Sequence, residues 1–213
     1  MQTEKPERTD IPYWDAFYIG DLAHKPPSDF AKFAADYMLP HKMLIDIGCG
    51  NGRDSMYFCN MGLKVTAIDS SMEAINSFDK SMPVFAVCDD FVKTKALLCI
   101  DYDYCYARWS IHAIPQSGQD ELLPNIFRSI KNGGLLFVES RTVNDVKYGE
   151  GEPLGLHEYI CDNHYRRFLD PNAFILQLEA IGFEIVYYEE SDTFSIIGND
   201  APMLMRVIAK KPD

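Results

Sequence analysis

The sequence predicts an α/β fold in which a mostly parallel, doubly wound sheet carries helices on both faces. Short apolar segments alternate along the chain with segments of helical periodicity, a pattern typical of strand–helix–strand units. The apolar segment 43–47 leads into a turn with glycines at 48, 50 and 52, and the segment 63–68 ends at an aspartate. Because parallel strands end at the same edge of a sheet, we expect the turn and this aspartate to lie together.

The remaining elements follow from apolar periodicity and from the positions of glycine and proline. Further strands are expected at 83–88, 101–107, 135–139, 183–188 and 203–209, and helices at 28–39, 53–61, 72–80, 119–131 and 171–181. Asn132-Gly133-Gly134 is predicted to be the C-cap of the helix at 119–131. A long loop at 140–156, rich in glycine and acids, should lie over the carboxyl edge of the sheet.

Length and charge restrict the kinds of partner. A chain of 213 residues suits one main domain, here residues 41–213, preceded by an aromatic segment and a helix in residues 1–40. A formal net charge of -12 argues against nucleic acid and against an anionic membrane surface, since both need a basic face. No apolar run is long enough to cross a bilayer, and the first residues lack the apolar run of a signal peptide.

The six cysteines favour a reducing compartment. They are Cys49, Cys59, Cys88, Cys99, Cys105 and Cys161. None forms a C-x-x-C pair, so neither a zinc site nor a redox pair is indicated, and no metal is expected. Because they lie mostly in apolar segments, we interpret them as reduced thiols of a cytoplasmic protein.

The glycine turn is typical of a nucleotide-type site and restricts which ligand it takes. Its sequence is Asp46-Ile47-Gly48-Cys49-Gly50-Asn51-Gly52, and Arg53 stands where dinucleotide enzymes have their third glycine. No Gly-Lys-Ser/Thr follows, which excludes a P-loop. An aspartate two residues before the turn would repel a pyrophosphate but suits a ligand with positive charge, such as the sulfonium and ammonium of S-adenosylmethionine.

This turn resembles the first motif of the class I S-adenosylmethionine-dependent methyltransferases. Asp69 at the end of the second strand, and Asp90-Phe91 after the third, are similar to the next two motifs of that family and occur in the same order. The resemblance covers most of the chain. It implies a Rossmann-like sheet of seven strands with an antiparallel last strand, S-adenosylmethionine as cofactor and S-adenosylhomocysteine as product.

Three stretches suggest a narrower group. Residues 27–31, 50–55 and 108–114 are similar to small bacterial methyltransferases, some associated with tellurite-resistance-type proteins and others with tailoring of surface polysaccharide. Enzymes of the larger family that methylate bases or glutamine side chains carry Asn/Asp-Pro-Pro-Tyr/Phe after the fourth strand. This chain lacks that motif, which favours a small-molecule substrate over nucleic acid or protein.

The resemblance implies roles at the cofactor end of the site. Asp46 and the backbone around the turn would hold the methionine ammonium, Asp69 the ribose hydroxyls, and Asp90 with Phe91 the adenine, with Asp89 an alternative to Asp90. Arg53 or Arg108 would pair with the cofactor carboxylate or with a substrate anion. The expected cofactor-binding residues are Asp46, Gly48, Cys49, Gly50, Arg53, Asp69, Ser70, Asp90, Phe91 and Arg108.

The acceptor end depends on residue chemistry. A hydroxyl acceptor needs a base, and histidine has a suitable pKa, so His112 after the fourth strand and then His164 are the candidates; a structural role is the alternative for each. Arg166 and Arg167 beside His164 are candidates to clamp a small anion, unless they only form surface ion pairs. The expected substrate-binding residues are Tyr13, Tyr18, Trp109, Arg141, Arg166 and Arg167.

The aromatic cluster at 12–18 has two interpretations, an anchor for the N-terminal segment or a lid that closes over the site. With the motifs above, the sequence predicts a methyltransferase for a small, anionic molecule, with O-methylation favoured, in a monomer or homodimer. The alternatives are a nicotinamide-dependent oxidoreductase, which would also use Asp69, and a non-catalytic protein that binds S-adenosylmethionine.

Overall fold

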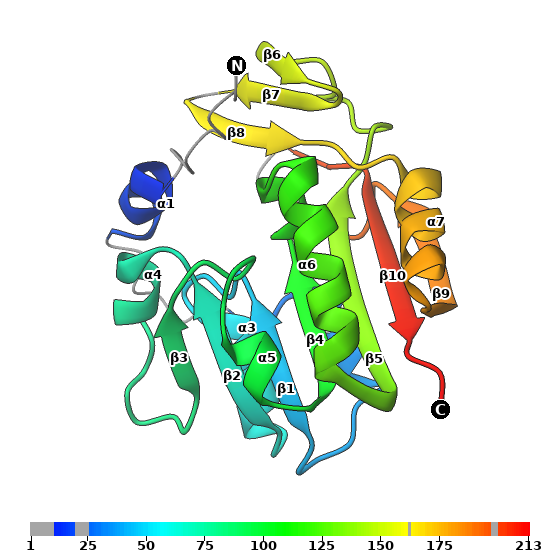
Figure 1. Cartoon of the computed structure of the whole chain (residues 1–213). Coiled ribbons are helices and arrows are strands. Elements are labelled where there is room, and N and C mark those ends of the chain that lie inside the picture. The colour runs from blue at the N-terminus through cyan, green and yellow to red at the C-terminus, as the bar shows by residue number, and fades with distance from the viewer. Residues whose placement is uncertain (1–10, 20–25, 162, 197–199) are drawn as a thin grey trace, which may run out of the picture.

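The main sheet has the predicted architecture. The computed structural model describes residues 11–19, 26–161, 163–196 and 200–213. In this part of the chain seven strands form one sheet of order β3-β2-β1-β4-β5-β10-β9 (Figure 1). The strands are β1 (Met43–Ile47), β2 (Lys64–Asp69), β3 (Phe85–Cys88), β4 (Tyr102–Arg108), β5 (Ile130–Arg141), β9 (Glu184–Ser191) and β10 (Leu204–Lys210). β10 runs in the opposite direction to the other six strands of this sheet, which confirms the expected antiparallel last strand.

Helices cover both faces, also as predicted. They are α1 (Ile11–Tyr18), α2 (Asp29–Ala35), α3 (Arg53–Asn60), α4 (Met72–Asn76), α5 (Ala96–Cys99), the 3-10 helix η1 (Ile111–Ala113), α6 (Gln116–Ser129) and α7 (Pro171–Ile181). One apolar cluster joins α5, α6 and α7 to one face of the sheet, and a second joins α2 and α3 to the other. The expected helices at 28–39 and 72–80 are shorter in the structure.

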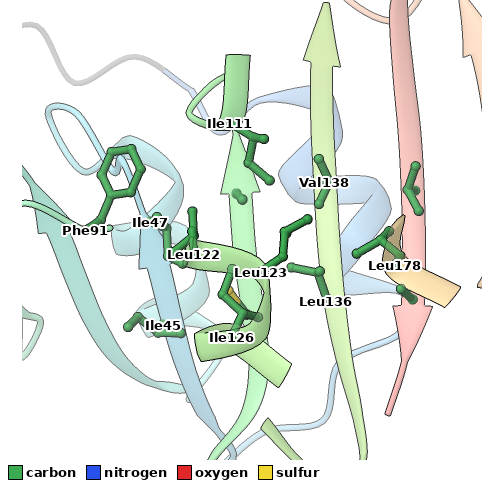
Figure 2. Close-up of a cluster of buried hydrophobic side chains, with 14 of the residues drawn as sticks. Ile45, Ile47, Phe91, Ile111, Leu122, Leu123, Ile126, Leu136, Val138 and Leu178 are labelled. Carbon is green, nitrogen blue, oxygen red and sulfur yellow. The ribbon is translucent and has the colours of Figure 1, made fainter. Parts of the chain in front are cut away.

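The larger core lies between α6 and the sheet (Figure 2). Alternation along β1 sends Ile45 and Ile47 to this face and Leu44 to the opposite one. Leu123 and its neighbours on α6 meet Leu136 of β5, and all of these side chains are fully buried. This packing fixes the carboxyl ends of the central strands against each other, and these ends carry the candidate site.

The predicted C-cap at Asn132-Gly133-Gly134 is wrong. Helix α6 already ends at Ser129, and β5 begins at Ile130. Gly133 has a φ of 76°, and its N–H donates to the carbonyl of Lys211 near the C-terminus. The glycine pair therefore pairs with a distant segment that the local sequence does not reveal.

A second sheet stands where the sequence predicted a loop and an unassigned segment. It consists of β6 (Glu152–Gly155), β7 (Glu158–Cys161) and β8 (His164–Arg167), all antiparallel. Figure 1 shows it across the end of the main sheet at which β1, β2, β4 and β5 terminate. None of the helices in the described part of the chain has the length and apolar composition to cross a membrane.

Leu123→Ala is predicted to lower the free energy of unfolding by about 2–5 kcal/mol, because the cavity it leaves lies between α6 and a rigid sheet. Urea unfolding followed by circular dichroism measures this loss. Leu176→Ala on α7 is the matched control, because its side chain is 64% exposed and the change should cost less than about 0.5 kcal/mol. Equal losses in the two variants would contradict this description of the core.

Candidate functional site

A cavity of about 440 Å³ lies between the carboxyl ends of β1, β2 and β4 and the segments α1 and η1. This volume is in the range of small-molecule sites. The predicted residues that line it are Tyr18, Asp46, Gly48, Cys49, Gly50, Arg53, Asp69, Ser70, Phe91, Arg108, Trp109 and His112. The cavity therefore brings together the glycine turn, the acid after β2 and the residues that follow β4.

The glycine turn leaves no room for side chains. Gly48 and Gly50 have φ angles of 70° and 56°, which disfavour other residues. A Cβ on Gly48 would lie 2.5 Å from Cβ of Ser110, and one on Gly50 would lie 2.3 Å from the hydroxyl of Tyr18. The turn therefore exposes its backbone to the cavity and is enclosed by Ser110, which precedes η1, and by Tyr18 of α1.

Asp69 holds the turn in this shape. Its Oδ2 accepts the N–H of Gly50 at 2.8 Å, and its Oδ1 accepts the N–H of Ser71 at 2.9 Å. The carboxylate thus ties the end of β2 to both the glycine turn and the start of α4. Since a carboxylate has about four lone-pair sites, it retains acceptor capacity toward the cavity.

Asp46 is a buried acid beneath the turn. Its Oδ2 accepts the Ser55 hydroxyl at 2.5 Å, and no cation lies within ion-pair distance among the described residues. Burial raises the pKa of Asp46 to about 8, and the nearby charges of Asp54 and Asp69 add to this rise against the Ser55 hydrogen bond. A cationic ligand in the cavity would supply the missing positive charge.

The loop after β3 contributes one of its predicted residues to the cavity lining. Phe91 is 3% exposed and lines the cavity. Asp90 lies outside the lining, and its Oδ1 accepts the N–H of Val92. Asp89 is exposed, and its Oδ1 accepts the N–H of Asp90. In this structure both carboxylates shape the turn.

Glu139 at the end of β5 is a functional candidate that the sequence analysis missed. Its side chain is 1% exposed and accepts from Nε of Arg108 at 3.1 Å, Nε1 of Trp109 at 2.9 Å and Nε of Arg206 at 2.8 Å. Arg108 and Arg206 are its register partners on β4 and β10. One carboxylate facing two guanidiniums leaves this cluster with one net positive charge. The sequence feature that could have identified Glu139 is an acidic residue at the end of an apolar segment that forms a buried strand.

Trp109 is held in an unusual conformation by the same glutamate. Its φ of 59° is rare for a bulky residue, and its backbone N–H donates to the carbonyl of Glu139. The guanidinium carbons of Arg108 and Arg141 lie 5.0 and 5.3 Å from the centre of its ring. Trp109 therefore turns the chain out of β4 and places η1 beside the cavity.

His112 lies on η1 and has distinct surroundings at its two ring nitrogens. The backbone N–H of Arg141 donates to Nδ1 at 3.2 Å, and the Ser140 hydroxyl lies 3.1 Å from the same nitrogen. A nitrogen that accepts a backbone N–H carries no hydrogen, so the neutral ring has its proton on Nε2. Burial lowers the pKa of His112 well below its usual range, and the charges of Arg141 and Arg167 lower it further.

The three arginines expected to bind substrate lie outside the cavity lining. Arg141 is 4% exposed and is paired with Asp145 and Asp200. Arg166 and Arg167 are neighbours on β8, so their side chains point to opposite faces of the small sheet. The two guanidiniums therefore do not converge on one ligand.

Arg167 is committed to η1 and to the start of α6. It is 3% exposed, and its guanidinium donates to the carbonyls of Ile111 and Ile114 and to the side-chain oxygens of Gln116 and Gln119. All of these acceptors are neutral. Burial lowers the pKa of Arg167, although not enough to remove the charge of a guanidinium. A positive charge therefore lies behind His112.

Helix α1 connects the cofactor edge of the cavity to the small sheet. Tyr13 stacks on His164 of β8 with ring centroids 4.3 Å apart, and Oδ1 of Asp15 accepts the Ser71 hydroxyl at 2.6 Å. Both Tyr13 and His164 lie outside the cavity lining. Three aromatic residues of α1 line the cavity: Trp14, Phe17 and Tyr18.

Sequence reasoning did not assign the other lining residues to the site. Asp54 accepts from the backbone and hydroxyl of Ser28 and from the hydroxyl of Tyr106, which joins α2, α3 and β4. Ser110 has a buried hydroxyl with no hydrogen-bond partner within the described part of the chain. The unassigned lining residues are Trp14, Phe17, Asn51, Asp54, Tyr106, Ser110, Ala113, Ser195 and Ile196.

Comparison with known proteins identifies a family and a fold. Residues 18–188 match the family model described as a methyltransferase domain. A search of curated proteins finds no match. Similar solved structures include a S-adenosylmethionine-dependent methyltransferase from Methanosarcina mazei, with a TM-score of 0.73, 17% identity, and coverage of 84% of this chain and 97% of that one.

Two further structures are similar at the same level. A TehB-like S-adenosylmethionine-dependent methyltransferase from Corynebacterium glutamicum has a TM-score of 0.66 and 16% identity, with 94% of this chain and 96% of that chain covered. The glycopeptide N-methyltransferase MtfA, solved with S-adenosylmethionine, has a TM-score of 0.65 and 18% identity, with 87% and 93% covered. At these identities the likeness shows the fold.

Asp46→Asn is predicted to stabilise the ligand-free protein, because folding removes an ionisable carboxyl from water. The unfolded carboxyl ionises near pH 3.8, whereas the folded one keeps its proton up to about pH 8. Its destabilising effect therefore grows between these pH values and is constant above pH 8. The gain in free energy of unfolding should exceed about 1 kcal/mol at pH 8 and vanish near pH 4.

Urea unfolding of wild type and Asp46→Asn at pH 4, 6 and 8 measures this dependence. Asp101→Asn, at an exposed position before β4, is the control and should show no comparable trend. A variant that is destabilised at pH 8, or a difference independent of pH, would contradict the raised pKa.

Arg167→Lys is predicted to lower the free energy of unfolding by about 2–4 kcal/mol, because an ammonium cannot reach acceptors on both η1 and α6 at once. Arg128→Lys, at an exposed position of α6, should change stability by less than about 0.5 kcal/mol. Denaturant unfolding of both variants makes the comparison, and equal losses would show that Arg167 has no special structural role.

Proposed function

The chain belongs to the methyltransferase-domain family, and on this premise we propose that it transfers the methyl group of S-adenosylmethionine to an oxygen atom of a small anionic molecule. The observation that carries the proposal is the distribution of charge around the cavity. Acidic side chains lie at the glycine turn, where a cationic cofactor is held. Arg108 lines the cavity toward the end that contains His112, where the acceptor would lie, and the charges of Arg141 and Arg167 act on His112 from outside the lining.

The residues at the glycine turn fit this cofactor. Asp46 is a buried acid that lacks a cation, and the turn is a cradle that any Cβ would fill. We assign the methionine ammonium to Asp46 and the backbone of Gly48 and Gly50, with Cys49 beside them. We assign the cofactor carboxylate to Arg53, because Arg108 donates a hydrogen bond to Glu139 at 3.1 Å, whereas Arg53 has only a longer ion pair of 3.7 Å with Asp54.

The nucleoside part of the cofactor is assigned to the ends of β2 and β3. Asp69 would accept the ribose hydroxyls with the lone pairs that the turn leaves free, and Ser70 lies next to it. Phe91 supplies an apolar surface for the adenine ring. Asp90 contributes through the shape of the loop unless the loop turns its carboxylate toward the ring.

The acceptor is assigned to the part of the cavity bordered by Tyr18, Trp109 and His112. When bound, S-adenosylmethionine supplies a methyl carbon that its sulfonium already activates. The protein then has to align the acceptor oxygen with that carbon and exclude water. Trp109 has a fixed indole for this purpose, and His112 provides a polar contact.

Within the segment 1–40, helix α1 is proposed to act as a lid, and residues 1–10 and 20–25 of that segment lie outside the described residues. The contacts of α1 that support this role are the stacking of Tyr13 on His164 and the approach of the Tyr18 hydroxyl to Gly50. Through these contacts α1 bridges the cofactor turn and the small sheet. Closure would remove water from the reacting atoms.

The remaining alternatives differ in simple observations. The glycine spacing and Asp46 disfavour a nicotinamide-dependent oxidoreductase, and the match to a methyltransferase domain gives it no support. A protein that binds S-adenosylmethionine without catalysis would bind the cofactor equally well, so turnover separates it from an enzyme. No disulfide joins any of the six cysteines within the described part of the chain, which supports our proposal of a cytoplasmic location.

S-adenosylhomocysteine at about 100 times its Kd is predicted to stabilise the protein by about 2.7 kcal/mol, or roughly 5–10 °C in Tm. A thermal-shift titration measures this, with NADH as the comparison ligand. Stabilisation by NADH and none by S-adenosylhomocysteine would overturn the assignment of the cavity.

Asp69→Asn is predicted to weaken S-adenosylhomocysteine binding at least tenfold, because an amide cannot accept both backbone N–H groups and ribose hydroxyls. Isothermal titration calorimetry gives the Kd of this variant and of Asp101→Asn, which is exposed and lies outside the cavity lining. Unchanged affinity in Asp69→Asn would refute the ribose contact.

A further inference from the structure

The ring of His112 has one nitrogen committed to the protein and one available to a ligand. Nδ1 accepts the backbone N–H of Arg141. Nε2 lies on the far edge of the ring. It has no hydrogen-bond partner among the described residues, and it is not fully buried. Because His112 lines the cavity, this edge is the one that a bound acceptor can reach.

This arrangement makes His112 a hydrogen-bond donor and a poor base. For Nε2 to take a proton, the hydrogen of the neutral ring would first have to move to Nδ1, and the charged ring would then carry hydrogens on both nitrogens. In both states the hydrogen on Nδ1 would point at the backbone N–H of Arg141, and this buried N–H would lose its acceptor. A buried donor left without its acceptor costs about 1–3 kcal/mol.

Burial and the charges near His112 also oppose protonation of its ring. Arg141 of β5, Arg166 and Arg167 of β8 and Arg108 of β4 all act to lower its pKa, after the larger effect of burial. Among the described residues, Arg167 has no carboxylate within ion-pair distance, although the more distant charges of Glu158 and Asp120 act to raise its pKa. The neutral ring and the positive surroundings together favour an anion beside Nε2–H.

Other candidates for a base at the cavity are already engaged. The three carboxylates that line it are Asp46, Asp54 and Asp69, and each accepts hydrogen bonds from the protein. Asp46 and Asp69 also belong to the proposed cofactor end. An acceptor that is already an anion would need none of these groups to take a proton, unlike a hydroxyl of high pKa.

We propose that the methyl acceptor is a carboxylate held by Nε2–H of His112, and that the product is a methyl ester. The proposal rests on the proposed methyltransferase function and names its substrate class. A carboxylate is ionised at neutral pH and needs no base. One carboxylate oxygen forms the new C–O bond with its own electron pair, while the C–S bond of the sulfonium breaks and leaves its pair on sulfur. No proton is released.

Arg167 is the positioning residue in this scheme. Its guanidinium holds the carbonyls of Ile111 and Ile114, which flank His112 in the chain. It thereby fixes the orientation of η1 without reaching the cavity. Its buried charge adds to the field that attracts the carboxylate.

The protonation state of His112 is testable without any reaction. In protein labelled with [15N]histidine, two- and three-bond proton–nitrogen correlations distinguish the two neutral forms from the charged ring. The signals absent from His112→Gln identify His112. We expect the neutral form with hydrogen on Nε2 throughout pH 6–8.5; a charged ring or hydrogen on Nδ1 in this range would overturn the proposal.

The substrate class is testable with S-adenosylmethionine labelled in its methyl group. The acceptor panel consists of mono-, di- and tricarboxylic acids, each paired with the corresponding alcohol and its phosphate ester. S-adenosylhomocysteine formation reports methyl transfer, and volatile methanol released by alkali reports a carboxyl methyl ester. We expect alkali-labile product from acids.

The outcomes of this panel separate the two proposals. Alkali-stable product from the alcohols would overturn the carboxylate proposal and leave the methyltransferase function intact. Labelled product from a phosphate ester alone would do the same. A panel in which no member yields S-adenosylhomocysteine above the rate without acceptor would count against both.

Variants of His112 separate a donor from a base. Gln retains an N–H donor near Nε2 but cannot take a proton, so His112→Gln should keep kcat/KM within about tenfold of wild type. His112→Ala should lose at least a hundredfold, mainly in KM for the acid, with the Kd of S-adenosylhomocysteine unchanged. His41→Gln, at an exposed turn before β1, is the control. Equal loss in the Gln and Ala variants, with both folded, would point to a base.

Discussion

The organisation of the site depends on the buried carboxylate of Glu139. It stands in register between Arg108 on β4 and Arg206 on β10, so a single row of side chains joins three adjacent strands. It also binds the indole N–H of Trp109, and the backbone carbonyl of Glu139 accepts that residue's N–H. Without this glutamate, two guanidiniums would remain buried and unpaired, at a cost of several kcal/mol. Trp109, the first residue after β4 that lines the cavity, therefore takes its position from this row.

The two ends of the cavity show opposite electrostatic strategies. At the glycine turn, the carboxyl of Asp46 is buried without a cation, which destabilises its ionised form in the ligand-free protein and raises its pKa. At the other end, burial and arginines keep His112 neutral. The stability lost at the first end is recovered when a cationic ligand binds, whereas the second end needs no rearrangement of charge. This division suits a reaction in which the donor is a cation and the acceptor an anion.

Local sequence was sufficient for the main sheet and for the prediction that the glycine turn and Asp69 lie together at one edge of it. Asp46, Gly48 and Asp69 were identifiable because each lies at the end of an apolar strand and the turn has its own glycine pattern. The partners of Glu139 come from strands that are distant in sequence, so no local pattern predicts them. The small sheet was not predicted, because β6 is fully exposed and β7 is only half-buried, so neither strand has a clear apolar pattern. Without a predicted strand at β8, the sequence analysis did not consider that adjacent arginines there point to opposite faces.

The four hydrogen bonds of Arg167 have a consequence for how this protein can diversify. They couple the small sheet to the segment that carries His112, so a displacement of β8 also displaces the histidine. The exposed strand β6 and the turn that follows it contribute none of these four hydrogen bonds and no residue to the cavity lining. Evolution, or an engineer, can therefore vary the surface of β6 and that turn without breaking the bonds that hold η1. Changes in β8 would instead alter the position of His112, so the two outer strands of the small sheet differ in how freely their sequence can change.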